Sequence, residues 1–104
     1  MKTLRDPKRK PTHPGEMLRE DVLPALDMTQ AQFAKRLGVS RLTVSELMLE
    51  KRGMSADMAM RVGRLTNTTP ESWLFMQYAL DLWLLQREPK RYRHIEPMAA
   101  LPNH

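Results

Sequence analysis

Apolar residues recur every three or four positions along most of this 104-residue chain. That spacing marks one face of an α-helix, and it is nearly continuous from His13 to about Leu85. It divides into five predicted helices, whose apolar residues include Met17, Leu18, Val22, Leu23 and Leu26, then Phe33, Ala34 and Leu37, then Val44, Leu47 and Met48, then Met58, Ala59, Val62 and Leu65, and a last run over 71–86. No internal repeat or convincing strand interrupts the pattern, so the predicted fold class is all-α.

Polar residues and prolines place the starts of these helices. Pro14 suits the first turn of the first helix, and Pro24 is expected to end or kink it. A side-chain oxygen just before a helix can accept hydrogen bonds from its free N–H groups, and the N-cap candidates are Thr29, Ser40, Ser55 and Thr69. The third helix is expected to end before Gly53.

The stretch AQFAKRLGVSRLTVSEL, residues 31–47, predicts two helices joined by a tight corner. Gly38 accepts the left-handed backbone that ends a helix, and Val39 can tuck beneath the corner. The small side chain of Ala34 lets the next helix cross closely. This is the pattern of a helix-turn-helix, although an ordinary corner in a helical bundle has similar spacing.

The outward side of the third helix distinguishes these two alternatives. Its exposed start carries Arg41, Leu42, Thr43, Ser45 and Glu46. In a docked helix-turn-helix, this end of the second helix enters the major groove of DNA. The pattern therefore favours DNA recognition over a purely structural corner.

Charge and composition agree with a nucleic-acid partner. The net charge of +5 and the pI of about 10.0 favour an anionic partner. The chain lacks cysteine, which excludes disulfides and thiolate metal sites and fits a reducing cytoplasm. No apolar run reaches the ~20 residues of a membrane span, and the charged start has no signal-peptide core. We therefore expect a cytoplasmic protein without a membrane partner.

One domain flanked by two basic segments is expected. Residues 1–12 contain almost nothing apolar and predict a flexible arm, with basic residues Lys2, Arg5, Lys8, Arg9 and Lys10. Residues 13–87 form the predicted DNA-binding and dimerisation domain. Three prolines after residue 87 argue against another long helix, so 88–104 is expected to be a basic tail.

Three motifs point to a family. HPGEMLRE opens the first helix, FAKRLGVSRLTVSEL spans the corner and TTPESWLFMQYALDLW opens the fifth helix. With them the chain resembles lambda-repressor-like, Cro/C1-type (XRE) proteins, and most of all the HigA antitoxins and VapI-like regulators. Ser72 departs from the TPEFWL form that is usual there. The resemblance implies a five-helix lambda-repressor-like domain that represses its own operon and neutralises a HigB-type, mRNA-cleaving ribonuclease toxin.

The predicted DNA-binding residues are Gln30, Lys35, Arg36, Ser40, Arg41, Thr43, Ser45, Glu46 and Lys51. Arg41 can donate two hydrogen bonds to a guanine edge or neutralise a phosphate. Thr43 can bond to a base and pack against a thymine methyl group, and Ser40 can cap its helix and touch a phosphate. The resemblance implies a phosphate contact for Gln30, whose alternative is an exposed side chain without a role. The basic residues that could contact the backbone or remain solvated are Lys35, Arg36, Lys51 and Arg52.

Glu46 is the residue that fits DNA least well. Phosphates repel a carboxylate, which can accept hydrogen bonds only from cytosine N4 or adenine N6. A surface ion pair is the alternative, but helical pairs form three or four residues apart, and no cation stands at those positions. The nearest cations on the helix, Arg41 and Lys51, are each five residues away.

Apolar residues lie on two sides of the predicted fifth helix. One face holds Trp73, Met76, Leu80, Trp83 and Leu84, and the roughly opposite face holds Leu74, Tyr78, Leu82 and Leu85. A domain this small can cover one face, so the second is expected to meet another copy across a two-fold axis. Coverage by the basic tail is the alternative. A dimer would place two recognition helices about one DNA turn apart and read an inverted repeat.

The sequence offers little for catalysis or metal binding. The three histidines are scattered, and the acids on the exposed side of the first helix have no nucleophile or Gly-rich phosphate loop beside them. We expect no enzyme activity, cofactor or metal. Because both termini are basic, any toxin contact is expected on the folded domain, at Glu16 and Glu20. A stand-alone regulator and a protein-interaction module that no longer reads DNA are the alternative functions.

Overall fold

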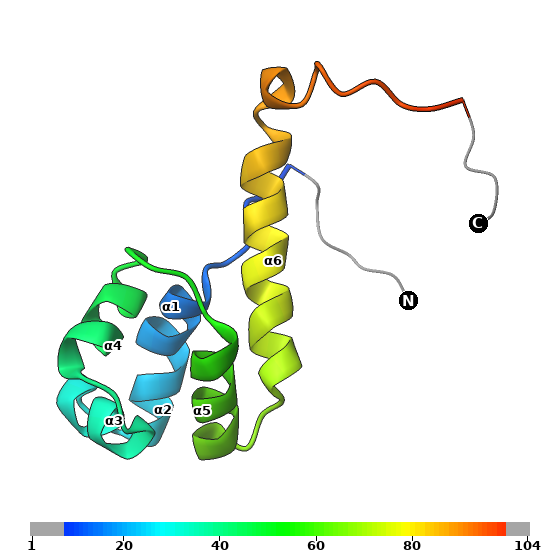
Figure 1. Cartoon of the computed structure of the whole chain (residues 1–104). Helices are drawn as coiled ribbons and strands as arrows, with labels where there is room; N and C mark the ends of the chain where they lie inside the picture. The colour runs from blue at the N-terminus through cyan, green and yellow to red at the C-terminus, as the bar shows by residue number, and fades with distance from the viewer. Residues whose placement is uncertain (1–7, 100–104) are drawn as a thin grey trace.

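The computed structural model describes residues 8–99, and every regular element in that range is helical (Figure 1). The elements are α1 (Pro14–Met17), the π-helical turn η1 (Leu18–Val22), α2 (Leu23–Leu26), α3 (Gln30–Leu37), α4 (Arg41–Met48), α5 (Ala56–Thr66), α6 (Pro70–Gln86) and the short 3-10 turn η2 (Pro89–Arg91). Because α1, η1 and α2 follow one another without a break, they form the single first helix that the sequence predicts. The all-α, five-helix prediction is confirmed.

Pro24 does not end the first helix where the sequence suggests an end or a kink. Proline has no N–H, and in α-helical geometry its ring clashes with the carbonyl group four residues earlier. The helix widens into the π turn just before it, where the N–H of Leu23 donates to the carbonyl oxygen of Leu18. The helix then ends at Asp27, which has a left-handed backbone with φ of 54°. The wider turn thus accommodates Pro24 inside the helix.

Four of the helix starts are capped as predicted. The side-chain oxygens of these residues each accept from a backbone N–H three positions later, and they are Thr29, Ser40, Ser55 and Thr69. At Thr29 the bond is reciprocal, because Gln32 Oε1 accepts from the N–H of Thr29 at 2.9 Å. These local signals therefore fix the boundaries of α3 to α6.

Gly38 makes the corner between α3 and α4. Its φ is 76°, and the N–H of Val39 donates to the carbonyl oxygen of Ala34 at 3.1 Å. Arg61 on α5 closes the corner from outside, because its Nη1 donates to the carbonyl oxygen of Leu37 at 2.9 Å. The buried core beneath consists of Leu18, Leu23, Phe33, Ala34, Leu37, Val44, Leu47, Met48, Met54, Met58, Ala59, Val62 and Trp73. The predicted helix-turn-helix is therefore present and tied to α5.

Helix α1 holds α4 from behind through a contact between backbones. A Cβ atom placed on Gly15 would lie 1.8 Å from the carbonyl oxygen of Leu47. Only glycine leaves room for this approach. His13, which the sequence places just before the helix, is its N-cap: Nδ1 accepts from the N–H of Gly15 at 2.8 Å. The His-Pro-Gly segment thus fixes where α4 stands.

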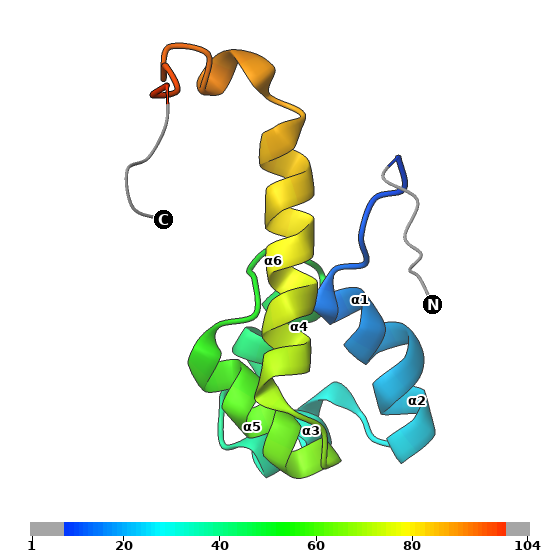
Figure 2. The same ribbon diagram turned by 90° about the vertical axis from the view of Figure 1, so that its right-hand side faces the viewer.

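Helix α6 packs on α5 with its first half and extends beyond the domain with its second (Figures 1 and 2). Trp73 anchors its start, because Nε1 donates to Thr68 Oγ1 at 2.8 Å. Gln77 is buried, and its Oε1 accepts from the N–H of Met54 at 2.7 Å while its Nε2 donates to Asp81 Oδ1 at 3.0 Å. This polar anchor was not predicted, because nothing in the local sequence pairs position 77 with position 54.

Burial of His13 predicts a stability that depends on pH. Desolvation lowers the pKa of His13 below 6.5, although Glu50, the backbone of Arg52 and Asp81 oppose this shift. Between about pH 6.5 and the lower folded pKa, the unfolded chain binds more protons than the folded one, so stability falls as pH falls. A protonated Nδ1 also cannot accept from Gly15. We expect the unfolding free energy to decline as the pH falls below about 6.5, until the pH passes the lower folded pKa of His13.

The matched variant for this prediction is His13→Asn. An Asn side chain also caps helices well but does not titrate. The variant should therefore keep the fold while flattening the pH dependence in that window, as measured by urea unfolding at each pH. An equally steep decline in the variant would show that other groups cause it.

Candidate nucleic-acid interface

The start of α4 is held by two hydroxyl groups. Ser40 Oγ accepts from the N–H of Thr43 at 3.0 Å and lies 2.8 Å from Thr43 Oγ1. This pairing orients the Thr43 side chain, which is half-buried at the edge of the exposed surface. The cap therefore presents the first turn of α4 in one fixed arrangement.

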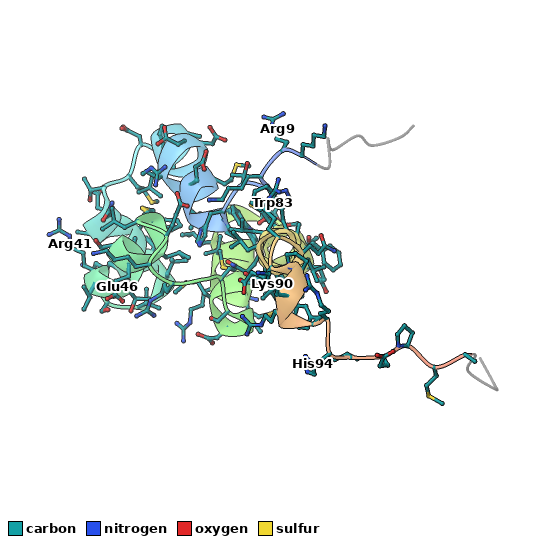
Figure 3. All side chains as sticks on the ribbon, turned by 90° about the horizontal axis from the view of Figure 1, so that it is seen from above. Arg9, Arg41, Glu46, Trp83, Lys90 and His94 are labelled. Atoms are coloured by element: carbon teal, nitrogen blue, oxygen red, sulfur yellow. The ribbon has the colours of Figure 1, made fainter. Side chains whose placement is uncertain are left out.

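Arg41 extends outward from this first turn. Figure 3 shows its side chain pointing away from the domain, on the side of the molecule opposite His94 in the tail. Within residues 8–99, no hydrogen bond or ion pair holds its guanidinium group. Leu42 beside it is 65% exposed. An unpaired cation and an exposed apolar side chain at a helix start form a surface suited to an anionic, grooved partner.

Glu46 has an ion pair, contrary to the expectation that the spacing offers none. Arg52 Nε donates to Glu46 Oε1 at 3.1 Å, and Arg52 Nη2 binds the same oxygen. The chain reverses after α4, because Glu50 has a left-handed φ of 63° and the N–H of Lys51 donates to the carbonyl oxygen of Glu46 at 2.8 Å. The sequence argument was wrong because it considered only partners within a helix.

The ion pair between Glu46 and Arg52 also bears on one of the alternative functions, an interaction module that does not bind DNA. A lone carboxylate at position 46 would favour an interaction module without DNA binding, because phosphates repel it. With Arg52 beside it, the carboxylate does not stand alone on the surface. Glu46 and Arg52 line a hollow between α4 and α5 together with Lys51 and Ser55.

Of the other predicted residues, Ser45 is half-buried on α4, and three lie on α3. Gln30 is half-buried at the first position of α3, next to the Thr29 cap. Lys35 and Arg36 are exposed near its other end. Arg36 lines a hollow with Arg61 and Arg64 of α5, and no residue of α4 contributes to it. The capped starts of α3 and α4 thus position Gln30 and the residues at the start of α4. For Lys35 and Arg36, a contact with the DNA backbone stays a prediction.

The outer stripe of α6 differs by one residue from the predicted dimer face. Leu74 is half-buried against the protein's own core, whereas Phe75 is 66% exposed. With Tyr78 and Leu82, which are also exposed, Phe75 follows the three- and four-residue spacing of one helix face. The helical wheel included Leu74 where Phe75 is the exposed residue, and it placed the rest of the stripe at the same positions. Leu85 is half-buried at its end.

The described part of the tail, residues 88–99, does not cover this stripe. Residues 86–99 are all exposed, and the segment after η2 runs away from the domain (Figure 1). At the other end of the chain Lys8, Arg9 and Lys10 are exposed but Pro11 is buried, so the chain contacts the domain three residues before α1 begins. The other basic residues of the predicted arm, Lys2 and Arg5, lie outside the described residues.

The predicted toxin-contact residues lie on the outside of the first helix. Glu16 and Glu20 are exposed. Glu20 Oε2 accepts from Arg19 Nε at 2.8 Å, so part of its charge is already compensated. In residues 8–99 no three acidic or histidine side chains gather as metal ligands would. No helix in the same range has the length and apolar character to cross a membrane.

Known proteins resemble this chain over most of its length. A family model described as helix-turn-helix matches residues 18–74. Virulence-associated protein I from Dichelobacter nodosus is 37% identical over 88 residues, which cover 85% of this chain and 82% of that protein. Antitoxin HigA-1 from Vibrio cholerae is 38% identical over 80 residues, which cover 77% and 75%. The Pseudomonas aeruginosa antitoxin HigA, solved with the higBA promoter, matches with a TM-score of 0.77 at 36% identity, covering 88% of this chain and 100% of that one.

Proposed function

This chain belongs to the helix-turn-helix family, among the relatives of HigA antitoxins and VapI-like regulators, and we propose that it binds operator DNA and represses its own operon. The observation that carries this proposal is the unpaired Arg41 on the outward start of α4. A guanidinium group without an internal partner has all its donors available for guanine or phosphate. The antitoxin HigA of Pseudomonas aeruginosa, solved with promoter DNA, supports the same assignment.

In this proposal α4 enters the major groove by its first turn. Arg41 contacts a guanine edge or a phosphate, and Thr43 bonds to a base or packs on a thymine methyl group. Gln30 begins α3, Ser40 caps the start of α4 and Lys51 follows its end, and in this proposal they bind phosphates and fix the register. Phosphate contacts position the domain, and base contacts choose the sequence.

Arg41→Ala is the variant that tests this site. If Arg41 reads a base, operator affinity should fall by about 1–3 kcal/mol, while affinity for unrelated DNA changes less. If it contacts only phosphate, both affinities should fall together and the salt dependence should become shallower. Fluorescence anisotropy with labelled duplexes at several salt concentrations measures both.

Arg93→Ala is the matched control, because it removes the same charge from an exposed residue of the tail, next to His94, which lies on the side opposite Arg41 (Figure 3). Equal affinities for Arg41→Ala and wild type on both kinds of duplex would remove Arg41 from the interface.

A dimer completes the proposed DNA-binding unit. The exposed stripe of Phe75, Tyr78 and Leu82 on α6, with Leu85 at its end, supports an isologous contact between two copies. Leu74 was also predicted there, but its half-buried side chain packs against the protein's own core. Two α4 helices related by that axis would read the two halves of an inverted repeat.

We further propose that the chain neutralises a HigB-type ribonuclease, with Glu16 and Glu20 on the first helix facing the toxin. Its similarity to antitoxin HigA-1 supports a toxin partner. A stand-alone regulator is the second candidate, supported by the HTH-type transcriptional regulator YbaQ from Escherichia coli, which is 40% identical to this chain over 75 residues. The adjoining reading frame distinguishes the two candidates. If it encodes a small basic protein, and that protein co-purifies with this chain, the antitoxin is favoured.

A further inference from the structure

Glu46 and Arg52 form a preorganised pair on the outward side of the helix-turn-helix. Two nitrogens of Arg52, Nε and Nη2, bind one carboxylate oxygen of Glu46, Oε1. These two hydrogen bonds hold the two side chains together. The pair is not buried: the Glu46 side chain is 33% exposed and the Arg52 side chain 47% exposed. Each partner therefore keeps a face toward solvent.

The atoms that the pair leaves unused are the ones that can bind a base. Among residues 8–99 nothing donates to Glu46 Oε2, and no acceptor binds Arg52 Nη1. The cation also cancels the charge that would repel a lone carboxylate from phosphates. The pair thus presents an acceptor beside a set of donors, at close to zero net charge.

We propose that Glu46 and Arg52 together read one C·G base pair in each half-site. Glu46 Oε2 accepts from cytosine N4, and Arg52 donates to O6 or N7 of the paired guanine. A C·G pair presents one donor followed by two acceptors across the major groove, which is the complement of this arrangement. A·T pairs present a different order, and a reversed G·C pair puts acceptors against the carboxylate. The inference rests on the proposed function, because it requires α4 to occupy the groove.

Selection from a double-stranded DNA library with a randomised core tests this directly. The wild-type chain should enrich an inverted repeat with cytosine at one symmetric position. Glu46→Gln keeps the size of the side chain but adds an amide donor, and Gln pairs best with adenine. The variant should lose the cytosine preference by about tenfold and shift toward adenine at that position alone. Arg52→Ala should weaken the same preference.

The matched control is Glu71→Gln, which makes the same chemical change at an exposed residue in the first turn of α6. It should leave the selected sequence unchanged. A wild-type chain that enriches no sequence would contradict the proposed function itself. A clear repeat that Glu46→Gln leaves unaltered would overturn the base-reading role of the pair while the proposed function stands. Equal loss of affinity for selected and unrelated duplexes in Glu46→Gln would overturn it as well, since the pair would then serve structure alone.

Discussion

Gly15→Ala is expected to destabilise the domain and to remove most of its operator affinity. The added methyl carbon would lie 1.8 Å from the backbone oxygen of Leu47, so α1 and α4 must move apart. A flexible side chain could turn away, but a carbonyl group inside a helix cannot do so without disturbing that helix. Overpacking of a core costs about 1–3 kcal/mol, and we expect a loss at the upper end of that range. Urea unfolding and duplex binding measure the two effects.

Glu16→Ala is the control for this variant, because Glu16 is adjacent in the same turn but exposed. Exposed substitutions usually change stability by no more than about 0.5 kcal/mol. The two variants should therefore differ clearly in unfolding free energy. If Gly15→Ala unfolds at the wild-type urea concentration and binds DNA equally well, α1 does not hold α4 in the way described.

Leu82→Glu is expected to convert a dimer into folded monomers that bind the operator poorly. Leu82 is 57% exposed, so the domain does not need it for its own core. A carboxylate in the centre of an apolar two-fold contact would meet its own copy and lose hydration on association. Linked half-sites gain about 10²–10⁴ in affinity over single ones, so operator binding should fall by at least about 100-fold. Sedimentation equilibrium and anisotropy titrations report the two changes.

Met60→Glu provides the comparison, because Met60 is an exposed apolar residue that lies on α5 and is not part of the α6 stripe. It introduces the same charge in place of a similar apolar surface. This variant should remain dimeric and bind the operator with wild-type affinity. Wild-type protein that sediments as a monomer at micromolar concentration would exclude the α6 contact altogether.

Local signals in the sequence predicted the helices and the corner correctly. A hydroxyl group three positions before the N–H that it caps, or a glycine at a helix end, acts within one turn of chain. Ser40 and Gly38 could therefore be read without knowing any tertiary contact. His13 at the start of α1 belongs to the same class, because its bond to Gly15 spans two residues.

Contacts between distant segments could not be predicted in this way. The partner of Gln77 is 23 residues away, and the partner of Glu46 is reached only because Glu50 turns the chain back. Glutamate rarely takes a left-handed backbone, so nothing in the sequence marks that reversal. Leu74 and Phe75 illustrate a smaller limit: they differ by one position, and only the contact of α6 with the core decides which is exposed.

The ratio of specific to non-specific affinity measures whether α4 reads operator sequence. The wild-type chain is titrated, at one fixed salt concentration, against the inverted repeat that it selects from a randomised duplex library and against an unrelated duplex of equal length. We expect binding to the selected duplex to be tighter by at least about 10³-fold. Failure to select any sequence, or equal dissociation constants for the two duplexes, would show that α4 does not read operator sequence.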